Sequence, residues 1–322
     1  MVPDARFRSY YGRPVVKAAP WENDIPAYLF LGGLAAGSSL LAAGADLTAR
    51  PALRRSARLG AMGAITAGSV ALVHDLGRPG RFANMLRVAK PTSPMSVGSW
   101  LLALYGPAAG LAGAAELRDL LPRPLARLGR LLGLVARPAG LAAAMVAPAV
   151  ASYTAVLLTD TATPSWHEAR DQLPFVFVGS AAVASAGLGM LATPPNQAGP
   201  ARRMALGGAL VELVAERRME AAMGITAEPL GTGRAGRLMR LGRLLTAGGA
   251  SGALLAGRGN RLVACASGAA LLAGSACTRF GVFQAGQASA RDPRYTVVPQ
   301  RERLDRLTAH GSPPQESPRP GV

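Results

Sequence analysis

The chain has 322 residues, of which half are apolar or aromatic and only 16% are charged, too few charges for the surface of a soluble protein of this length. The apolar residues are mostly Ala and Leu rather than alternating β-branched types, which argues against a membrane β-barrel. The net charge of +17 comes from 33 Arg and two Lys against 18 acidic residues, and the Arg residues bracket apolar runs, which indicates an all-α integral membrane protein and no nucleic-acid partner.

Residues 1–24 form a polar N-terminal segment, and the first charge-free stretch covers residues 26–45. A helix needs about 20 apolar residues to cross roughly 30 Å of hydrocarbon, so this stretch predicts one crossing. It is too long for the apolar core of a signal peptide, and we expect it to stay in the protein. Gly33 and Gly37, four residues apart, allow close helix approach and place this span in the centre of a bundle.

The second and third predicted spans cover residues 59–73 and 96–115. The second is short, but Arg58 before it can snorkel to the interface. It ends at His74 and Asp75, where an embedded acid is either a proton acceptor and headgroup partner or simply the salt-bridge partner of Arg78. On the same side, the first span begins with polar and aromatic residues: Trp21, Glu22, Asn23, Asp24 and Tyr28. The polar rims of the first and second spans should therefore face each other. In the structural alternative, Trp21 and Tyr28 belong to the interfacial aromatic belt.

Charge-free residues 138–159 and 172–201 predict the next two spans. Tyr153, inside the first of them, can offer its hydroxyl to a carbonyl or serve packing alone. Residues 204–223 carry five charges and either cross the membrane or lie in the interface as an amphipathic helix. Glu212 and Glu216, one turn apart there, could form a proton relay, although Glu216 could equally pair with Arg217 or Arg218.

The last two predicted spans, residues 244–257 and 262–278, are flanked by arginines expected to snorkel: Arg243, Arg258, Arg261 and Arg279. Counting residues 204–223 as a crossing gives eight transmembrane helices in a bundled domain over residues 25–285, with both termini on one side. The tail over residues 286–322 is rich in Pro, Arg and Ser, and we expect it to run over the surface or be partly disordered.

Loop charges bear on orientation in the cell membrane. Under the eight-helix topology, thirteen Arg lie on the side opposite the termini and eleven Lys or Arg in loops on the side of the termini. The positive-inside rule then favours extracytoplasmic termini.

The chain contains three His and two Cys, and no CxxC motif. Cys265 and Cys277 are twelve residues apart and are expected to pack in the core. Two internal haems would need four axial His, and no haem-specific pattern supports a single haem between His74 and His167. We therefore expect no haem, iron–sulfur cluster or metal site in this chain, and no catalytic residue of its own.

Taken together, several segments resemble the NrfD/polysulfide reductase membrane-subunit family. The resemblance rests on residues 21–37 (WENDIPAYLFLGGLAAG), 75–82 (DLGRPGRF), 91–100 (PTSPMSVGSW), 153–158 (YTAVLL), 164–166 (PSW) and the closing segment 279–301, with AGQASARDPRYTVVPQR. It covers most of the chain, and it implies an eight-helix membrane anchor of molybdopterin oxidoreductases.

The resemblance implies that the subunit holds no redox centre and places a quinone or quinol near a ferredoxin-like iron–sulfur subunit, which exchanges electrons with a molybdopterin catalytic subunit of formate dehydrogenase or polysulfide reductase type. By motif, Asp75 corresponds to a quinone-site or proton-handling residue, with Arg78 and His74 beside it and Tyr153 as a second headgroup contact. Asn23, Asp24 and Tyr28 resemble the segment that lines the same pocket, although Ile25 and Pro26 depart from relatives with a polar residue there. Arg residues on the terminal side would suit an acidic partner, or anchor in lipid headgroups.

Two other classes of function remain open from the sequence. A secondary transporter or ion-translocating protein is suggested by Glu212, Glu216 and Asp160 near membrane segments, although paired broken helices in matching halves are missing. A passive scaffold that only tethers a soluble enzyme predicts that Asp75→Asn is silent in assembly and in turnover.

Overall fold

The computed structural model describes residues 13–255 and 259–309, and this part of the chain is helical without a strand. Its long helices are α1 (Asp24–Leu47), α2 (Pro51–Asp75), α4 (Pro94–Ala115), α5 (Ala126–Thr159), α7 (Leu173–Ala192), α8 (Gly199–Ala222), α10 (Gly233–Leu255) and α11 (Arg261–Arg291). Shorter elements join them: η1 (Pro79–Arg81), α3 (Phe82–Met85), η2 (Arg118–Leu120), η3 (Arg123–Leu125), α6 (Pro164–Glu168), η4 (Gly224–Ala227) and α9 (Glu228–Gly231), with α12 (Arg294–Ala309) last.

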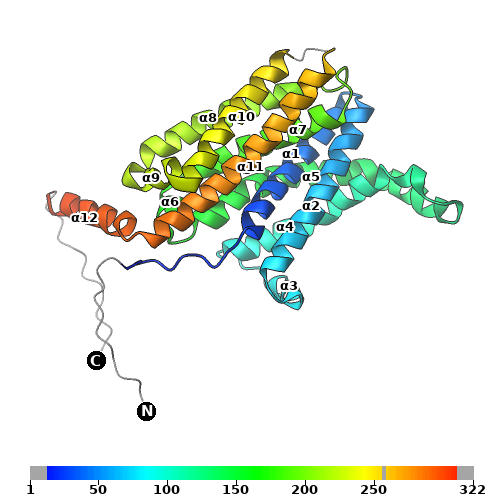
Figure 1. Cartoon of the computed structure of the whole chain (residues 1–322). Coiled ribbons are helices and arrows are strands. Elements are labelled where there is room, and N and C mark those ends of the chain that lie inside the picture. Colours follow the sequence, from blue (N-terminus) through cyan, green and yellow to red (C-terminus); the bar gives the residue numbers. More distant parts are fainter. Residues whose placement is uncertain (1–12, 256–258, 310–322) are drawn as a thin grey trace.

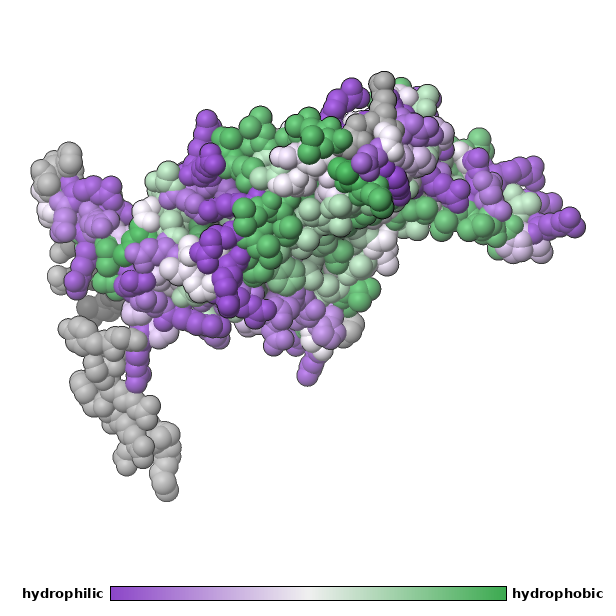
Figure 2. Space-filling model, turned by 45° about the horizontal axis from the view of Figure 1, so that its top comes forward, coloured by the Kyte–Doolittle hydropathy of each residue, from purple (hydrophilic) through white to green (hydrophobic). Residues whose placement is uncertain are grey.

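Six of these helices are long and apolar enough to cross a membrane: α1, α2, α4, α5, α7 and α11. The chain is therefore a multi-pass, all-α membrane protein. Hydrophobic side chains gather over the middle of the bundle and hydrophilic ones toward its ends (Figure 2). Helices α8 and α10 have 24 and 23 residues, enough length to cross, but α8 carries seven charged residues and α10 carries four arginines, and neither is apolar enough to count with the six.

Neighbouring helices in the sequence pack as hairpins, α1 with α2, α4 with α5, α7 with α8 and α10 with α11 (Figure 1). Helix α1 also contacts α5, α7 and α11 and so joins the hairpins. The end of the bundle that carries α3, α6, α9 and α12 is called the terminal end here, since the first and last described residues lie on that side, and the opposite end is called the distal end.

Small residues on α1 explain its central position, as the sequence predicts. A Cβ atom on Gly37 would lie 2.5 Å from the Ala181 carbonyl oxygen of α7, and one on Gly33 would lie 2.8 Å from a guanidinium nitrogen of Arg279. Both distances are too short for real atoms, so the two glycines are what allows α7 and the Arg279 side chain to approach the α1 backbone.

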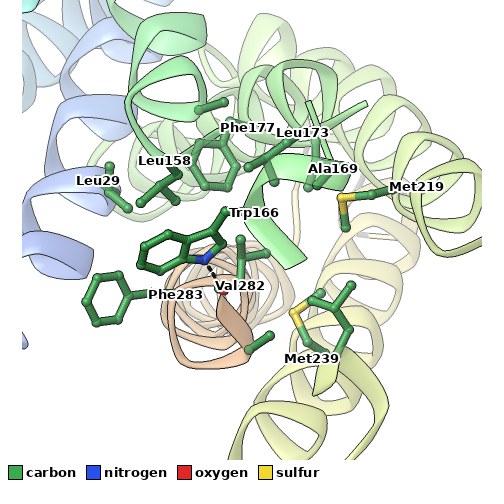
Figure 3. Close-up of a cluster of buried hydrophobic side chains, with 14 of the residues drawn as sticks. Leu29, Leu158, Trp166, Ala169, Leu173, Phe177, Met219, Met239, Val282 and Phe283 are labelled. Atoms are coloured by element: carbon green, nitrogen blue, oxygen red, sulfur yellow. Dashed lines mark hydrogen bonds between the residues drawn. The ribbon is translucent and has the colours of Figure 1, made fainter. Parts of the chain in front are cut away.

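An aromatic cluster around Trp166 packs the helices together at the terminal end of the bundle (Figure 3). Trp166 of α6 is fully buried and donates its indole N–H to the Val282 carbonyl of α11 at 2.9 Å. Its ring stacks on Trp21 at 5.9 Å between centroids and lies 5.5 Å from Phe283. Trp21 therefore packs on a buried indole, a role more specific than membership of an interfacial belt.

Two helix boundaries differ from those predicted. Helix α5 begins at Ala126, twelve residues before the charge-free stretch, because Arg127, Arg130 and Arg137 lie in an exposed extension that projects beyond the other helices (Figure 1). The charge-free residues 172–201 do not form one span: α7 ends at Ala192, where Thr193-Pro194-Pro195 turns the chain into α8.

Two arginines expected to snorkel are buried instead. Arg279 is fully buried because α11 continues past it to Arg291, and Arg58 is 6% exposed because acidic residues at the distal end pair with it. Arg258 lies outside the described residues. In the tail, residues 294–309 form the surface helix α12, whereas residues 310–322 lie outside the described part.

Candidate functional site

Four polar side chains meet at the terminal end, from the beginning of α1, the residue two positions before it and the end of α2: Glu22, Asp24, His74 and Asp75, called the acidic rim below. The Nδ1 atom of His74 lies 2.7 Å from a carboxylate oxygen of Asp24, which ties the end of α2 to the beginning of α1. Asp75 lies within electrostatic reach of Asp24 and Glu22. The predicted facing of the two polar rims is thus confirmed.

Arg78 and Asn23 lie next to the acidic rim in the sequence but make no side-chain hydrogen bond or ion pair with it among the described residues. Arg78 follows the end of α2 and is exposed, and the described residues contain no ion pair between Arg78 and Asp75. Gly77, at φ 65°, directs the chain away from α2 at this point. Asn23 occupies the N-cap position of α1, with an exposed side chain that makes no capping hydrogen bond. The alternative in which Asp75 only neutralises Arg78 therefore has no geometric support.

Two tyrosines lie between the acidic rim and the interior. Tyr28, one turn into α1, is 2% exposed and packs against Gly32 and Gly68. No hydrogen bond from its hydroxyl to a described residue is present, and Tyr153 of α5 lies within electrostatic reach. A buried phenol with an unused O–H is a ready donor to a carbonyl ligand.

Tyr153 uses its hydroxyl inside the protein. It donates to the Pro94 carbonyl of α4 at 2.5 Å, and its ring fills the space beside Gly98, where a Cβ atom would lie 2.1 Å away. The segment 91–100, singled out in the sequence, therefore begins α4 against Tyr153. A cavity of about 260 Å³ adjoins it, lined mainly by methionines and serines: Met85, Val88, Lys90, Ser93, Met95, Ser96 and Ser99.

A second polar group lies deeper, where α8 faces α7, α10 and α11. Glu212 is 1% exposed, and neither of its carboxylate oxygens has a hydrogen-bond partner among the described residues, although the hydroxyls of Ser180 and Thr278 lie nearby. One turn on, Glu216 accepts from Arg243 at 3.0 Å, and Arg243 also pairs with Glu220. The predicted pairing of Glu216 with Arg217 or Arg218 is not what the structure shows.

Arg279 of α11 completes this group and was not predicted as a functional residue. It donates to the Phe177 carbonyl at 2.6 Å and to the Thr154 hydroxyl at 3.3 Å, and its guanidinium lies 3.8 Å from the centroid of the Phe177 ring. Its Nε has no hydrogen-bond partner among the described residues. The available signal was the further eleven uncharged residues that follow it before Arg291.

Arg279 contacts the two helices that carry the tyrosines. Thr154, which accepts from Arg279, directly follows Tyr153, and Gly33, which makes room for Arg279, is five residues beyond Tyr28. We call the residues Glu212, Glu216, Glu220, Arg243 and Arg279 the buried charged group. It reaches the bundle surface at Arg243 and Glu220, whose side chains are 35% and 29% exposed.

Other candidate ligands have ordinary contacts. The Nδ1 atom of His167 lies 3.2 Å from the Thr159 carbonyl oxygen and the other ring nitrogen lies 3.4 Å from Arg170. Cys265 and Cys277 are unpaired and partly buried. Asp160, considered for ion transport, is an exposed residue at the end of α5.

A model of the family described as "Polysulphide reductase, NrfD" matches residues 15–195, more than half of the chain. The chain belongs to the NrfD family. The matched segment runs from before α1 to the end of α7 and contains the acidic rim, Tyr28 and Tyr153. The search of curated proteins found no match to this chain.

Membership places this NrfD-family chain among membrane subunits of oxidoreductase complexes that work with other subunits. The expected family is thereby confirmed. Glu212, Glu216 and Arg279 lie beyond residue 195, so the buried charged group is argued from its geometry in this chain alone.

Proposed function

We propose that this chain is the quinone-binding membrane anchor of a multi-subunit oxidoreductase. The observation that carries the proposal is the placement of the acidic rim directly above Tyr28, a buried phenol with an unused hydroxyl at the terminal end of the bundle. A quinone requires hydrogen bonds to its carbonyl oxygens, an apolar slot and a source of protons, and these residues match that requirement.

The roles divide according to the contacts. Tyr28 donates a hydrogen bond to one quinone carbonyl. Tyr153, whose proton is committed to Pro94, forms a wall of the slot with its ring and contacts the headgroup there. Asp75, with His74 and Asp24 beside it, accepts and returns the protons that accompany quinol oxidation or quinone reduction. Asn23 and Arg78 lie at the mouth and orient the entering headgroup.

Electrons must pass between the quinone and another subunit, in one direction or the other. The proposed partner is a ferredoxin-like iron–sulfur protein, which in turn serves a molybdopterin catalytic subunit. The terminal end offers it a surface, since a cavity of about 760 Å³ is lined there by residues of α6, η4 and α12, including Arg170, Arg303 and Arg306. An acidic partner would be complementary to these arginines.

The buried charged group supports coupled proton transfer. Glu212 has free carboxylate oxygens in the interior, and Glu216, Arg243 and Glu220 lead from it to the bundle surface. Charged groups this deep in a membrane protein cost free energy to bury, and those that are kept typically have a function. We assign Glu212 and Glu216 to proton exchange with the quinone region, with the Arg279 guanidinium as the positive charge near Glu212.

The same group favours a second candidate function, ion translocation without quinone chemistry. The two differ in their response to Tyr28→Phe, which removes one hydroxyl at the rim and leaves the buried charged group intact. Quinone anchoring predicts a rise of about tenfold in the quinone KM or a matching loss in kcat, in line with one lost hydrogen bond. Ion translocation predicts unchanged behaviour.

The matched control is Tyr105→Phe, since the Tyr105 hydroxyl is also buried but bonds Ser39 at 2.8 Å inside the α1–α4 contact. Turnover of the intact complex with a soluble quinone analogue is measured for both variants, with subunit content checked in parallel. Equal rates for the two variants with the complex intact would remove Tyr28 from the quinone site.

A further inference from the structure

A cavity of about 590 Å³ lies at the distal end, between the α1–α2 turn, the end of α4 and the first part of α5. It belongs to neither polar group at the other end of the bundle. Its charged lining consists of five arginines and three carboxylates, an excess of two positive charges: Arg54, Arg55, Arg58, Arg118, Arg137, Asp46, Glu116 and Asp119. We call it the distal basic cavity.

The carboxylates of this cavity are shared among several arginines. Glu116 accepts from Arg54 at 3.0 Å and from Arg58 at 2.9 Å. Asp46 lies 3.3 Å from Arg54 and 3.4 Å from Arg137. Two carboxylates therefore serve three guanidinium groups, each of which has more donors than these contacts use.

Donors remain available for an additional anion. Arg58 is 6% exposed, and its Nε has no hydrogen-bond partner in the described part of the chain. Arg55 lines the same cavity and makes no ion pair with any described residue. A bound phosphate would accept hydrogen bonds from both the buried guanidinium of Arg58 and the neighbouring guanidinium of Arg55. The planar guanidinium group presents its N–H donors in a geometry that matches phosphate oxygens.

The stretch of α5 that borders the cavity also exposes apolar side chains on its other faces. Gly133, Ala136 and Arg137 line the cavity, whereas Leu131, Leu134 and Val135 lie on other sides of the helix and expose 60%, 76% and 38% of their surface. This part of α5 belongs to the extension that projects beyond the bundle, where Figure 2 shows hydrophobic and hydrophilic side chains side by side. Apolar residues next to arginines at the end of a membrane bundle are typical of the lipid interface.

We propose that the distal basic cavity holds the phosphate headgroup of an anionic phospholipid, with its acyl chains along the exposed leucines of the α5 extension. The excess of positive charge selects an anionic over a zwitterionic lipid. The exposed leucines favour a lipid over free phosphate, because free phosphate would leave them in water.

The test uses the intact purified complex after delipidation. Phosphatidylglycerol, phosphatidylcholine or inorganic phosphate is added, and bound lipid is counted by native mass spectrometry with thermal stability measured in parallel. The variant is Arg55→Gln with Arg137→Gln. The control is Arg130→Gln, which removes an exposed arginine seven residues before Arg137 on the same helix and outside the cavity.

We expect wild type and the control to retain phosphatidylglycerol and to be stabilised by it, and the double variant to bind it at least about tenfold more weakly. If the double variant misfolds, Arg55→Gln alone is used, because Arg55 has no ion pair to lose. Equal affinity of variant and wild type, equal binding of phosphatidylcholine, or stabilisation by inorganic phosphate alone to the same degree would each overturn the proposal.

Discussion

At the residue scale, the guanidinium of Arg279 links α11 to three other helices. It reaches the Phe177 carbonyl of α7 and Thr154 of α5, and it fits against Gly33 of α1. We expect Arg279→Lys to destabilise the protein by about 2 kcal/mol, because an ammonium group cannot make the same divergent contacts. Thermal unfolding in detergent measures this, with Arg291→Lys at the exposed end of α11 as the control. Equal melting temperatures for the two variants would contradict the assigned role.

A second residue-scale prediction concerns helix approach. Gly37→Ala brings a methyl group to 2.5 Å from a backbone oxygen of α7, and we expect a loss of about 1–3 kcal/mol from this overpacking. Gly44→Ala is the control, since no atom lies within 4 Å of its added Cβ. Thermal unfolding of both variants should show a lower melting temperature for Gly37→Ala alone, and a neutral Gly37→Ala would mean that α1 and α7 are not closely packed.

Individual residues were predictable from sequence where their position along the chain determined their neighbours. Asp24 and His74 stand at adjoining ends of consecutive spans, so their contact followed from the topology. The contact of Tyr153 with Pro94 did not, since it depends on how α4 and α5 lie against each other, and neither did the burial of Arg279, since its partners come from two helices distant in sequence.

At the element scale, the eight-helix topology depends on α8, which carries seven charged residues, and on α10, which carries four arginines. Glu212 and Glu216 of α8 are buried in the bundle, so they lower the mean hydropathy of α8 without facing lipid. The arginines of α10 all lie in the first half of that helix, at the terminal end. We therefore expect both helices to cross. The sequence left the crossing open for α8 alone, because charged residues run along most of that helix.

Cysteine labelling tests the crossing of α8. In a chain with Cys265 and Cys277 replaced by Ser, Asn196→Cys and Thr232→Cys place thiols at exposed positions just before α8 and just before α10. We expect a membrane-impermeant thiol reagent to label them from opposite sides of the membrane. Labelling of both from the same side would show that α8 lies in the interface and would reduce the number of crossings.

In the proposed complex, helix α12 lies at the surface that contacts the partner subunit. It is fixed to the bundle by Arg303 with Glu168 at 3.3 Å and by Arg294 with Glu228 at 2.8 Å. We expect deletion of residues 294–322 to release the proposed iron–sulfur subunit during purification while the membrane domain keeps its melting temperature. Deletion of residues 310–322 alone is the control. Full retention of the partner by the longer deletion would exclude α12 from the interface.

At the scale of the whole molecule, the two ends of the bundle differ in their polar residues and in the roles proposed for them. The terminal end carries the acidic rim, the two tyrosines and the surface around α12, and the distal end carries arginines suited to lipid phosphate. Apolar runs in the sequence were sufficient to predict the membrane class and six helices. They could not predict how the helices associate, which depends on close contacts of small residues and on buried polar pairs between distant segments.

Quinone binding within an oxidoreductase complex is the proposed function of this chain. The most direct measurement is affinity purification of the tagged protein from native membranes in mild detergent, with co-purifying subunits identified and iron, molybdenum or tungsten, and quinone quantified. We predict recovery of an iron–sulfur subunit, a metallopterin enzyme and bound quinone, with the quinone reduced in amount by Tyr28→Phe. A metal-free homo-oligomer without quinone would contradict the account and direct attention to ion flux through Glu212.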